Sequence, residues 1–226
     1  MLKLVVFDMA GTTVNNTFGV HDSLIAAFAS EGISIDRQLA NKSIAVPKPV
    51  GVRRILDAVK GKGHWEEMQA VAIHERFQKE IIRFYQEDKS VEEMPGCVEL
   101  FKKLKAKGIK IGIDTGFDRR TANVIIERLK WLEKGLIDAS VTSDEVEKGR
   151  PYPDMIVRHM EQFQIGSAKE VAKVGDTPAD IQQGKNTGCA QVIAISSGAF
   201  TLEELQREEP DIIIHHLSEL LEIWNL

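Results

Sequence analysis

The chain has 226 residues, of which 43% are hydrophobic and 28% are charged, ordinary values for a globular protein with a sizeable core. Its net charge of −5 gives no support to nucleic-acid or anionic-membrane binding, which relies on clustered Lys and Arg, so neither partner is expected. The apolar run from Leu2 to Phe7 is too short for a signal peptide or a membrane span. Cys97 and Cys189 lie far apart and form no CxxC pair, which predicts free thiols in a cytoplasmic protein.

Short apolar runs that end in small or acidic residues predict the strands of a sheet. Four runs are clear and two are weaker, and helical patterns lie between most of them. Continuous apolar strands that alternate with helices are typical of an α/β fold with a parallel sheet covered on both faces. In chain order the predicted strands are Leu4–Phe7, Ile109–Ile113, Ala139–Thr142 (weak), Val171–Val174, Val192–Ile195 and Ile212–Ile214 (weak).

The alternation is interrupted after the first strand, because residues 15–89 contain no good strand pattern. Met94-Pro95-Gly96 restarts it with a helix over Cys97–Lys107, which Gly108 ends. We therefore expect residues 1–14 and 90–226 to form a core domain, and residues 15–89 to form an inserted, all-helical cap domain. The helical patterns within the insert are Ser23–Ser30, Arg53–Val59, with Pro49 suited to a first turn, and Trp65–Tyr85.

In an open parallel sheet, ligands bind at the carboxyl ends of the strands. The residues there are Asp8 after the first strand, Asp114-Thr115-Gly116 after the second and Asp176 after the fourth. Arg150 lies in the loop that follows the third. Acidic, hydroxyl and cationic side chains from distant parts of the sequence are thus expected to meet at one edge of the sheet.

A carboxylate in the position of Asp8 can attack phosphorus as a nucleophile and form an acyl phosphate. A dianionic phosphoryl group repels a carboxylate, so a divalent cation is expected between them. Asp8, Asp176 and the backbone carbonyl of Ala10 offer the oxygen ligands that Mg²⁺ prefers. Asp180 lies one helical turn after Asp176 and is expected to orient the cation or a water molecule.

The remaining residues of the predicted site suit a phosphoryl group. Thr115 and the amides around Gly116 would hold its oxygens, and Arg150 or Lys148 would balance its charge. Each feature has an ordinary structural explanation, since Asp after a strand often caps a helix and Thr-Gly often forms a turn. Caps and turns do not explain, however, why all these residues occur together at successive strand ends.

Four motifs of the chain resemble those of the haloacid dehalogenase superfamily over its whole length. They are FDMAGTT, IDTG, KGRPYPD and GDTPAD, in this order and spacing. The resemblance implies a Rossmann-like core, a C1 cap in the helical insert and Asp8 as the nucleophile. It further implies Mg²⁺ between Asp8, the Ala10 carbonyl and Asp176, with Thr115 on the phosphoryl group. The third motif places its basic residue directly before Pro-x-Pro, which matches Arg150 and leaves Lys148 as second choice.

Ala10 distinguishes this chain from ordinary phosphatases of the superfamily, which have Asp at that position. The Asp protonates the leaving oxygen and later deprotonates water, and loss of such a group typically costs ~10²–10⁴ in rate. FDMAGTTV resembles instead the phosphonatases (phosphonoacetaldehyde hydrolases), which also carry Ala there. Arg before Pro-x-Pro, as in Gly149-Arg150-Pro151, is likewise similar to phosphonatases.

Phosphonatases use a cap lysine to form a Schiff base with the substrate aldehyde. The imine is an electron sink, so a carbon–phosphorus bond can break without an acid on a leaving oxygen. Matching the chains at Gly32 places Lys48 at the position of that lysine, in the catalytic and substrate-binding set. Three features depart from the phosphonatase pattern: Ile44-Ala45 replaces Met-Gly, Gly51 replaces a helper His, and Pro47 and Pro49 flank Lys48.

Two further groups bear on this interpretation. A Schiff-base lysine needs a pKa lowered by burial or by a nearby cation, for which Arg53 and Arg54 are candidates, whereas the structural alternative for Lys48 is a solvated lysine outside a helix start. His21, near the entry to the insert, is a weaker candidate for the active site, and Asp22 is expected to cap a helix.

The sequence therefore predicts a Mg²⁺-dependent, phosphonatase-like hydrolase that acts on a small phosphonate or phosphorylated metabolite, with a cap that closes over the site. Two alternatives stay open. One is a phosphomonoesterase in which the substrate or a cap residue replaces the missing acid. The other is a low-turnover binding or regulatory protein on the same fold, against which the retained Asp8, Asp176, Thr115 and Arg150 argue. By the same resemblance, the helix after the first motif is a candidate surface for a homodimer.

Overall fold

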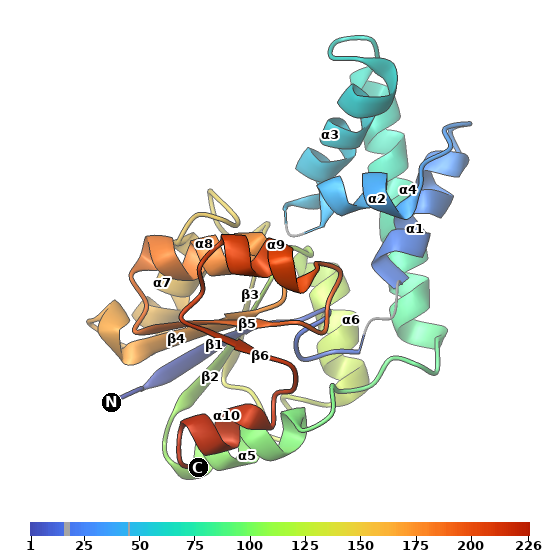
Figure 1. Cartoon of the computed structure of the whole chain (residues 1–226). Helices are drawn as coiled ribbons and strands as arrows, with labels where there is room; N and C mark the ends of the chain where they lie inside the picture. Colours follow the sequence, from blue (N-terminus) through green and yellow to red (C-terminus); the bar gives the residue numbers. More distant parts are fainter. Residues whose placement is uncertain (16–18, 45) are drawn as a thin grey trace.

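Six parallel strands form one sheet at the centre of the computed structural model, which describes residues 1–15, 19–44 and 46–226 (Figure 1). The strand order is β3-β2-β1-β4-β5-β6, so β1 lies between β2 and β4. All six predicted strands are present with ends within two residues of those expected, and the α/β fold class is confirmed. The strands are β1 (Leu4–Asp8), β2 (Lys110–Thr115), β3 (Ala139–Thr142), β4 (Val171–Gly175), β5 (Gln191–Ile195) and β6 (Ile212–Ile214).

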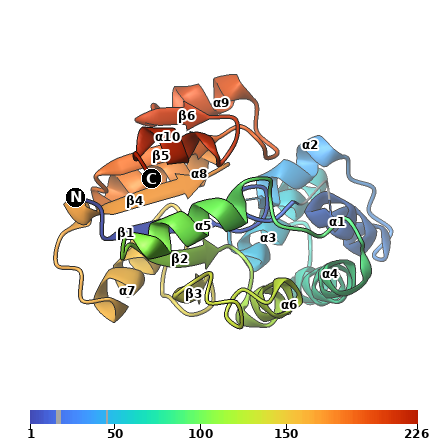
Figure 2. The same ribbon diagram turned by 90° about the horizontal axis from the view of Figure 1, so that it is seen from below.

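The two faces of the sheet bury separate apolar clusters, because successive side chains of a strand point to opposite faces. Val5 and Phe7 pack on one face, where the Phe7 and Phe101 ring centroids lie 5.1 Å apart. Leu4 and Val6 pack on the other. Figures 1 and 2 show the helices on each side. The first face carries α5 (Cys97–Ala106), α6 (Arg119–Leu129) and α10 (Glu219–Ile223), and the second carries α7 (Asp154–Gln162), α8 (Pro178–Thr187) and α9 (Leu202–Arg207).

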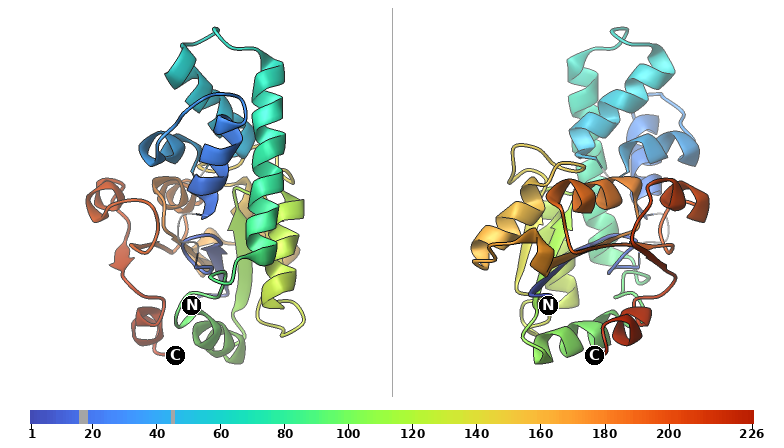
Figure 3. Two further views of the ribbon diagram at one scale, coloured as in Figure 1. Left: turned by 90° about the vertical axis from the view of Figure 1, so that its right-hand side faces the viewer. Right: turned by 60° about the vertical axis from the view of Figure 1, so that its left-hand side comes forward.

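Between β1 and α5 the described residues form helices and connecting segments but no strand, as the sequence predicts for an inserted cap. Figures 1 and 3 show these helices standing to one side of the sheet, with α4 continuing down beside α6. The division at residues 15–89 stays a prediction. The helices are α1 (Gly19–Ala29), α2 (Arg37–Ala40), the 3₁₀ turn η1 (Asn41–Ser43), α3 (Lys48–Lys60) and α4 (Glu67–Glu87); a second 3₁₀ turn, η2 (Ala168–Glu170), precedes β4.

The long helix α4 connects the helical region to the sheet. Gln78 donates a hydrogen bond to Asp118 at the start of α6 (2.6 Å), and Arg128 of α6 donates to the Tyr85 carbonyl (2.9 Å). Near the end of α4, the buried Tyr85 ring meets the Phe117 ring edge-on, with 5.7 Å between centroids. Among the described helices, none is long and apolar enough to cross a membrane.

Two helix starts differ from the sequence prediction. Helix α1 begins at Gly19, so Asp22 lies inside its first turn and does not cap it; its carboxylate pairs with Arg37 at 3.1 Å. A Cβ at Gly19 would lie 2.3 Å from the Phe84 ring, so the close packing of α1 on α4 needs glycine at this position. Glycine is a poor helix former, which is why the helical pattern in the sequence starts after it. Helix α3 begins at Lys48, five residues before the predicted pattern at Arg53, and Pro49 lies in its first turn, as predicted.

Gly112 of β2 leaves space for the buried imidazole of His159, which lies 3.1 Å from the Ile113 carbonyl. A Cβ at Gly112 would be 2.8 Å from His159 Nδ1. We expect Gly112→Ala to lower the free energy of unfolding by about 1–3 kcal/mol, the usual cost of overpacking, in urea denaturation. Gly166→Ala, at an exposed glycine with no atom near the added Cβ, is the control; equal stability of both variants would contradict this packing.

Candidate active site

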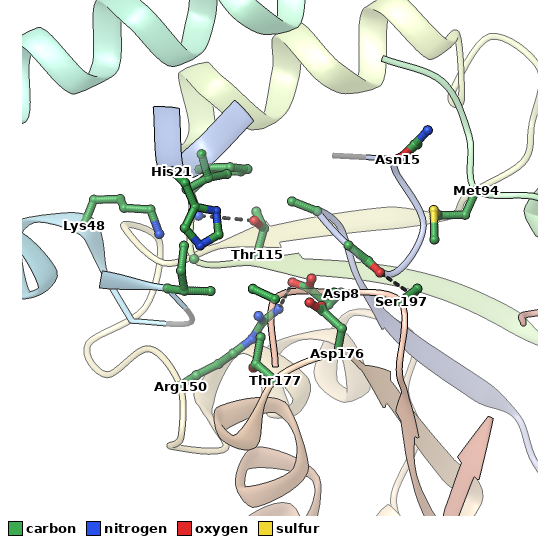
Figure 4. A pocket seen from close by; sticks show the side chains of 18 residues that line it. Asp8, Asn15, His21, Lys48, Met94, Thr115, Arg150, Asp176, Thr177 and Ser197 are labelled. Carbon is green, nitrogen blue, oxygen red and sulfur yellow. Dashed lines mark hydrogen bonds and ion pairs between the residues drawn. The ribbon is translucent and has the colours of Figure 1, made fainter. Parts of the chain in front are cut away.

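A cavity of about 170 Å³ lies between the carboxyl ends of the strands and the helical region (Figure 4). It brings together seven of the eight residues that the sequence predicts for the site, and Asp180 lies directly behind them. Residues from the helical region complete the wall. The predicted residues that line it are Asp8, Ala10, Lys48, Thr115, Gly116, Arg150 and Asp176, and the wall also includes His21, Phe117, Ser197 and Gly198.

The sheet topology explains why residues so distant in sequence meet here. Asp8 is the last residue of β1 and lies in register with Asp114 of β2, so Thr115 follows at the end of β2. Asp176 follows β4, the other neighbour of β1. The next residue, Thr177, caps α8 by accepting a hydrogen bond from the Asp180 amide, so Asp180 enters the site from the first turn of α8.

Arg150 is the centre of a buried cluster of charges. Its guanidinium lies 2.6 Å from Asp8 Oδ1 and 3.1 Å from Asp180 Oδ1, and it also contacts the Asp114 carboxylate and its backbone carbonyl. Lys173 of β4, fully buried, pairs with the same two carboxylates, Asp114 and Asp180. Arg150 therefore positions Asp8, the candidate nucleophile. Lys173 in turn pairs with Asp114 and Asp180, the two carboxylates that position Arg150.

Asp114 and Lys173 are site residues whose roles the sequence reasoning missed. Each is a charged residue in an apolar strand, Ile113-Asp114-Thr115 and Ala172-Lys173-Val174, and a charge at a buried strand position is the signal that was available. Lys148, the second choice for the third motif, is exposed and lies over the Tyr152 ring rather than in the cavity.

The carboxylates of the site differ in their ease of ionisation. Burial opposes ionisation of Asp114, but the charges of Arg150 and Lys173 outweigh it and lower its pKa to about 2. Burial raises the pKa of Asp8, although Arg150 lowers it in part. The pKa of Asp176 lies well above its usual value, because of burial and because Asp8 and Asp180 are close. Negative charge is thus least compensated between Asp8 and Asp176.

This uncompensated region fits a divalent cation. When all four buried carboxylates are ionised, they exceed their described ion-pair partners Arg150 and Lys173 by two negative charges, which one Mg²⁺ would neutralise. Two glycines leave room for the Asp176 carboxylate. A Cβ at Gly11 would lie 2.6 Å from Asp176 Oδ2, and a Cβ at Gly198 would lie 1.7 Å from the same oxygen. Oxygens of Asp8, Asp114 and Asp180 also lie within 4.8 Å of one another, but Arg150 and Lys173 already bind that group.

The backbone around Asp176 is held in place by short polar contacts. Thr12 donates a hydrogen bond to Asp176 Oδ1 at 2.9 Å, and Ser197 donates to the Gly11 carbonyl at 2.7 Å. Asp8, Asp176 and the Ala10 carbonyl are the groups that would hold a metal ion. The predicted action of Asp180 on a cation or water stays a prediction, because its carboxylate faces Arg150, Lys173 and the Thr177 hydroxyl.

Lys48, the first residue of α3, is buried with 7% of its surface exposed, so the expectation of a solvated lysine is wrong. Its ammonium donates a hydrogen bond to the Ser43 carbonyl (3.0 Å) and lies 5.5 Å from the centroid of the Phe117 ring. Burial lowers its pKa to about 8; the Asp8 charge opposes this shift and the Arg150 charge adds to it. The cation whose charge lowers the pKa of Lys48 is thus Arg150.

Arg53 and Arg54, which the sequence suggested for that role, lie elsewhere: Arg53 pairs with Glu67 at the surface, and Arg54 is exposed. Gly51, which replaces the helper His of phosphonatases, packs against η1. A Cβ at this position would lie 2.2 Å from Ser43 Oγ, so no larger side chain fits. Ala45, another departure from the phosphonatase pattern, lies outside the described residues.

His21, a weak candidate from the sequence, is part of the cavity wall. It lies in the first turn of α1, is 7% exposed and lines the cavity opposite the strand ends (Figure 4). Its Nε2 lies 2.7 Å from Asn41 Oδ1 in η1. A lone histidine in a helical pattern carries no signal that distinguishes this position from a structural one.

The fold and the site define an α/β enzyme whose site is built around a buried carboxylate at a strand end. The chain belongs to the haloacid dehalogenase-like hydrolase family, whose sequence profile matches residues 2–188. The family resemblance and the enzyme class predicted from the sequence, a hydrolase, are confirmed. Members of this family generally use Mg²⁺, in agreement with the donor set at Asp8 and Asp176.

Known proteins resemble the chain over nearly its whole length. A phosphonoacetaldehyde hydrolase from Bacillus cytotoxicus is 29% identical, over 98% of this chain and 86% of the relative. A phosphonoacetaldehyde hydrolase-like protein from Oleispira antarctica has a solved structure with a TM-score of 0.85 at 22% identity, covering 99% of this chain and 91% of the other. A predicted phosphoglycolate phosphatase from Haemophilus somnus gives the same TM-score at 19% identity, covering 99% and 98%. At these identities the two structures establish the fold alone.

Mg²⁺ is expected to stabilise the protein, because it relieves the repulsion between Asp8 and Asp176. At a hundred times its dissociation constant the gain is about 2.7 kcal/mol, measured as a rise in the urea midpoint. Asp176→Asn should remove most of that gain, whereas Glu133→Gln, at an exposed surface carboxylate, should leave it intact. An equal response of wild type and Asp176→Asn to Mg²⁺ would place the ion elsewhere.

Lys173→Met should destabilise the fold, because it leaves Asp114 and Asp180 buried with one cation instead of two. Removing one partner of a buried ion pair typically costs about 3–5 kcal/mol, which denaturant titration measures. Lys185→Met, which removes an exposed lysine of α8 that pairs with Glu209, should cost less than about 1 kcal/mol. Equal stability of the two variants would count against the cluster.

Proposed function

We propose that this protein is a Mg²⁺-dependent phosphonatase-type hydrolase that breaks the carbon–phosphorus bond of a small phosphonate aldehyde. One observation carries the proposal: a buried lysine of lowered pKa, Lys48, lines the same cavity as Asp8. The named phosphonoacetaldehyde hydrolase relative supports it. The cavity of about 170 Å³ favours a small substrate.

The strand ends would bind the phosphonate group. Thr115 and the Gly116 amide would take its oxygens, and Arg150 would balance its charge while holding Asp8 for attack on phosphorus. Asp8, Asp176 and the Ala10 carbonyl would hold Mg²⁺, which when bound reduces the repulsion between the Asp8 carboxylate and the anionic substrate. Phe117 and other apolar residues of the wall would surround the organic part of the molecule.

Lys48 would act on the aldehyde end. With a pKa of about 8, about a tenth of its amine is neutral at pH 7, compared with about three parts in ten thousand for an ordinary lysine. The neutral amine attacks the carbonyl carbon, and loss of water gives a protonated imine. When Asp8 attacks phosphorus, the carbon–phosphorus electron pair moves toward the imine and forms an enamine. No proton on a leaving oxygen is needed, which fits Ala10.

The phosphomonoesterase alternative has less support. Ala10 provides no side chain to protonate a leaving oxygen, so ester hydrolysis would need an acid from the helical region or from the substrate. The likeness to a predicted phosphoglycolate phosphatase concerns the fold only. Substrate turnover separates the two functions directly.

Phosphate release from phosphonoacetaldehyde with Mg²⁺ is the first test. We expect wild-type turnover, and a loss of at least about 100-fold in Lys48→Ala, the usual minimum for a group that acts in the transition state. Lys62→Ala, at an exposed lysine after α3, serves as the control. Turnover of phosphate monoesters alone, unchanged by Lys48→Ala, would favour the phosphatase; Mg²⁺-dependent phosphate binding without any turnover would favour the binding protein.

Trapping of the imine should depend on pH in the way that the lowered pKa of Lys48 dictates. Because the neutral amine is the nucleophile, the rate of borohydride-trapped adduct formation should rise with pH and level off above about 8. Intact-mass spectrometry, with peptide mapping to Lys48, measures the adduct. A midpoint near 10.5, the ordinary value for lysine, would show that the amine is not buried beside Arg150 in solution.

A further inference from the structure

A single turn of the helical region holds two side chains of the cavity. In η1, Asn41 Oδ1 lies 2.7 Å from Nε2 of His21, and the Ser43 carbonyl accepts a hydrogen bond of 3.0 Å from Lys48. His21 comes from α1 and Lys48 from α3, so η1 sets the position of one relative to the other. Figure 4 shows both pointing into the cavity above Thr115 and Asp8.

The contact with Asn41 determines which ring nitrogen of His21 can accept a proton. A side-chain amide oxygen is an acceptor only, so Nε2 carries hydrogen and Nδ1 carries the lone pair of the neutral ring. Imidazole of this form can take a proton at Nδ1 and return it later in the same cycle. Asn41 therefore prepares His21 for proton transfer.

Imine chemistry at Lys48 needs such a group. The ammonium must lose a proton before attack, and the hydroxyl of the carbinolamine must gain one to leave as water. Among the other titratable residues that line the described cavity, Asp8 and Asp176 are nucleophile and metal-ligand candidates and Arg150 stays protonated. His21 is the lining residue left for this proton.

We propose that His21 is the acid–base residue of Lys48 chemistry and that Asn41 is its positioning residue; the proposal rests on the phosphonatase function above. His21 takes a proton from the Lys48 ammonium, the neutral amine attacks the carbonyl carbon, and a proton of the attacking nitrogen passes to the carbonyl oxygen to give the carbinolamine. The imidazolium then gives its proton to the carbinolamine hydroxyl, the carbon–oxygen bond breaks and water leaves. After the carbon–phosphorus bond breaks, the enamine carbon takes a proton from solvent, and water hydrolyses the imine to free Lys48 and the aldehyde product. A second water hydrolyses the acyl phosphate on Asp8 and releases phosphate and a proton.

Gly51 explains why this role is located on α1. A Cβ there would lie 2.2 Å from Ser43 Oγ and 2.6 Å from Ser43 Cα, so a proton-transfer side chain at position 51 would displace η1. Displacing η1 would also remove the hydrogen bond that holds Lys48. In this chain, close packing of α3 on η1 and an acid–base residue at position 51 exclude each other.

The test measures how fast the imine forms at Lys48. Protein and phosphonoacetaldehyde are mixed with cyanoborohydride, quenched at increasing times, and the Lys48 adduct is followed by intact mass. His21→Gln should form the adduct at least about 100-fold more slowly than wild type. Its affinity for inorganic phosphate should stay within about threefold of wild type. His64→Gln, at an exposed histidine in the α3–α4 loop, is the matched control and should trap at the wild-type rate.

Two further variants keep the test informative if His21→Gln folds poorly. Asn41→Ala, which removes the contact with His21 Nε2, should slow trapping by roughly 10-fold to 100-fold. Added imidazole should restore the trapping rate of His21→Ala by about 10-fold or more, a rescue that a purely structural role would not give. Wild-type trapping rates in His21→Gln and Asn41→Ala would overturn the role of His21 and leave the proposed function standing. Absence of any Lys48 adduct in the wild type would overturn both.

Discussion

Charge balance in a buried site is the constraint on which the rest of this structure depends. Four carboxylates, Asp8, Asp114, Asp176 and Asp180, are buried at the ends of neighbouring strands and the start of α8. Charges removed from water cost several kcal/mol each unless they are paired, so Arg150 and Lys173 must be buried with them. The two charges left over favour a divalent cation beside Asp8, which is the basis for proposing a Mg²⁺ site there.

The same charge balance is consistent with a neutral residue at position 10. A carboxylate at this position would add a further negative charge to a cavity wall that is already short of cations. In the proposed function the core domain supplies a nucleophile, a metal site and anion ligands, but with Ala10 it supplies no acid for a leaving group. The same proposal assigns proton transfer to the helical region, whose buried Lys48 and His21 line the cavity.

The helical region is organised around η1 in a similar way. Asn41 and Ser43 contact the two cavity side chains, and Gly51 permits α3 to pack closely on this turn. The contact of Gln78 with Asp118, three residues after Thr115 at the end of β2, ties α4 to the core beside the cavity. Substrate binding at the strand ends and the placement of Lys48 are therefore linked through packed helices rather than through the flexible reach of one side chain.

The sequence by itself determined the parallel sheet, the helical insert and the identity of Asp8, Thr115, Arg150 and Asp176, because apolar periodicity and strand-end motifs are local properties of the chain. It also identified Lys48 as a candidate by resemblance. Only the tertiary structure decided that Lys48 is buried where the Arg150 charge acts on it, that Lys173 and Asp114 belong to the charge cluster, and that His21 lines the cavity. Burial and charge pairing arise from different strands and loops, such as Lys173 with Asp114 and Arg150 with Asp8, and no local pattern encodes them.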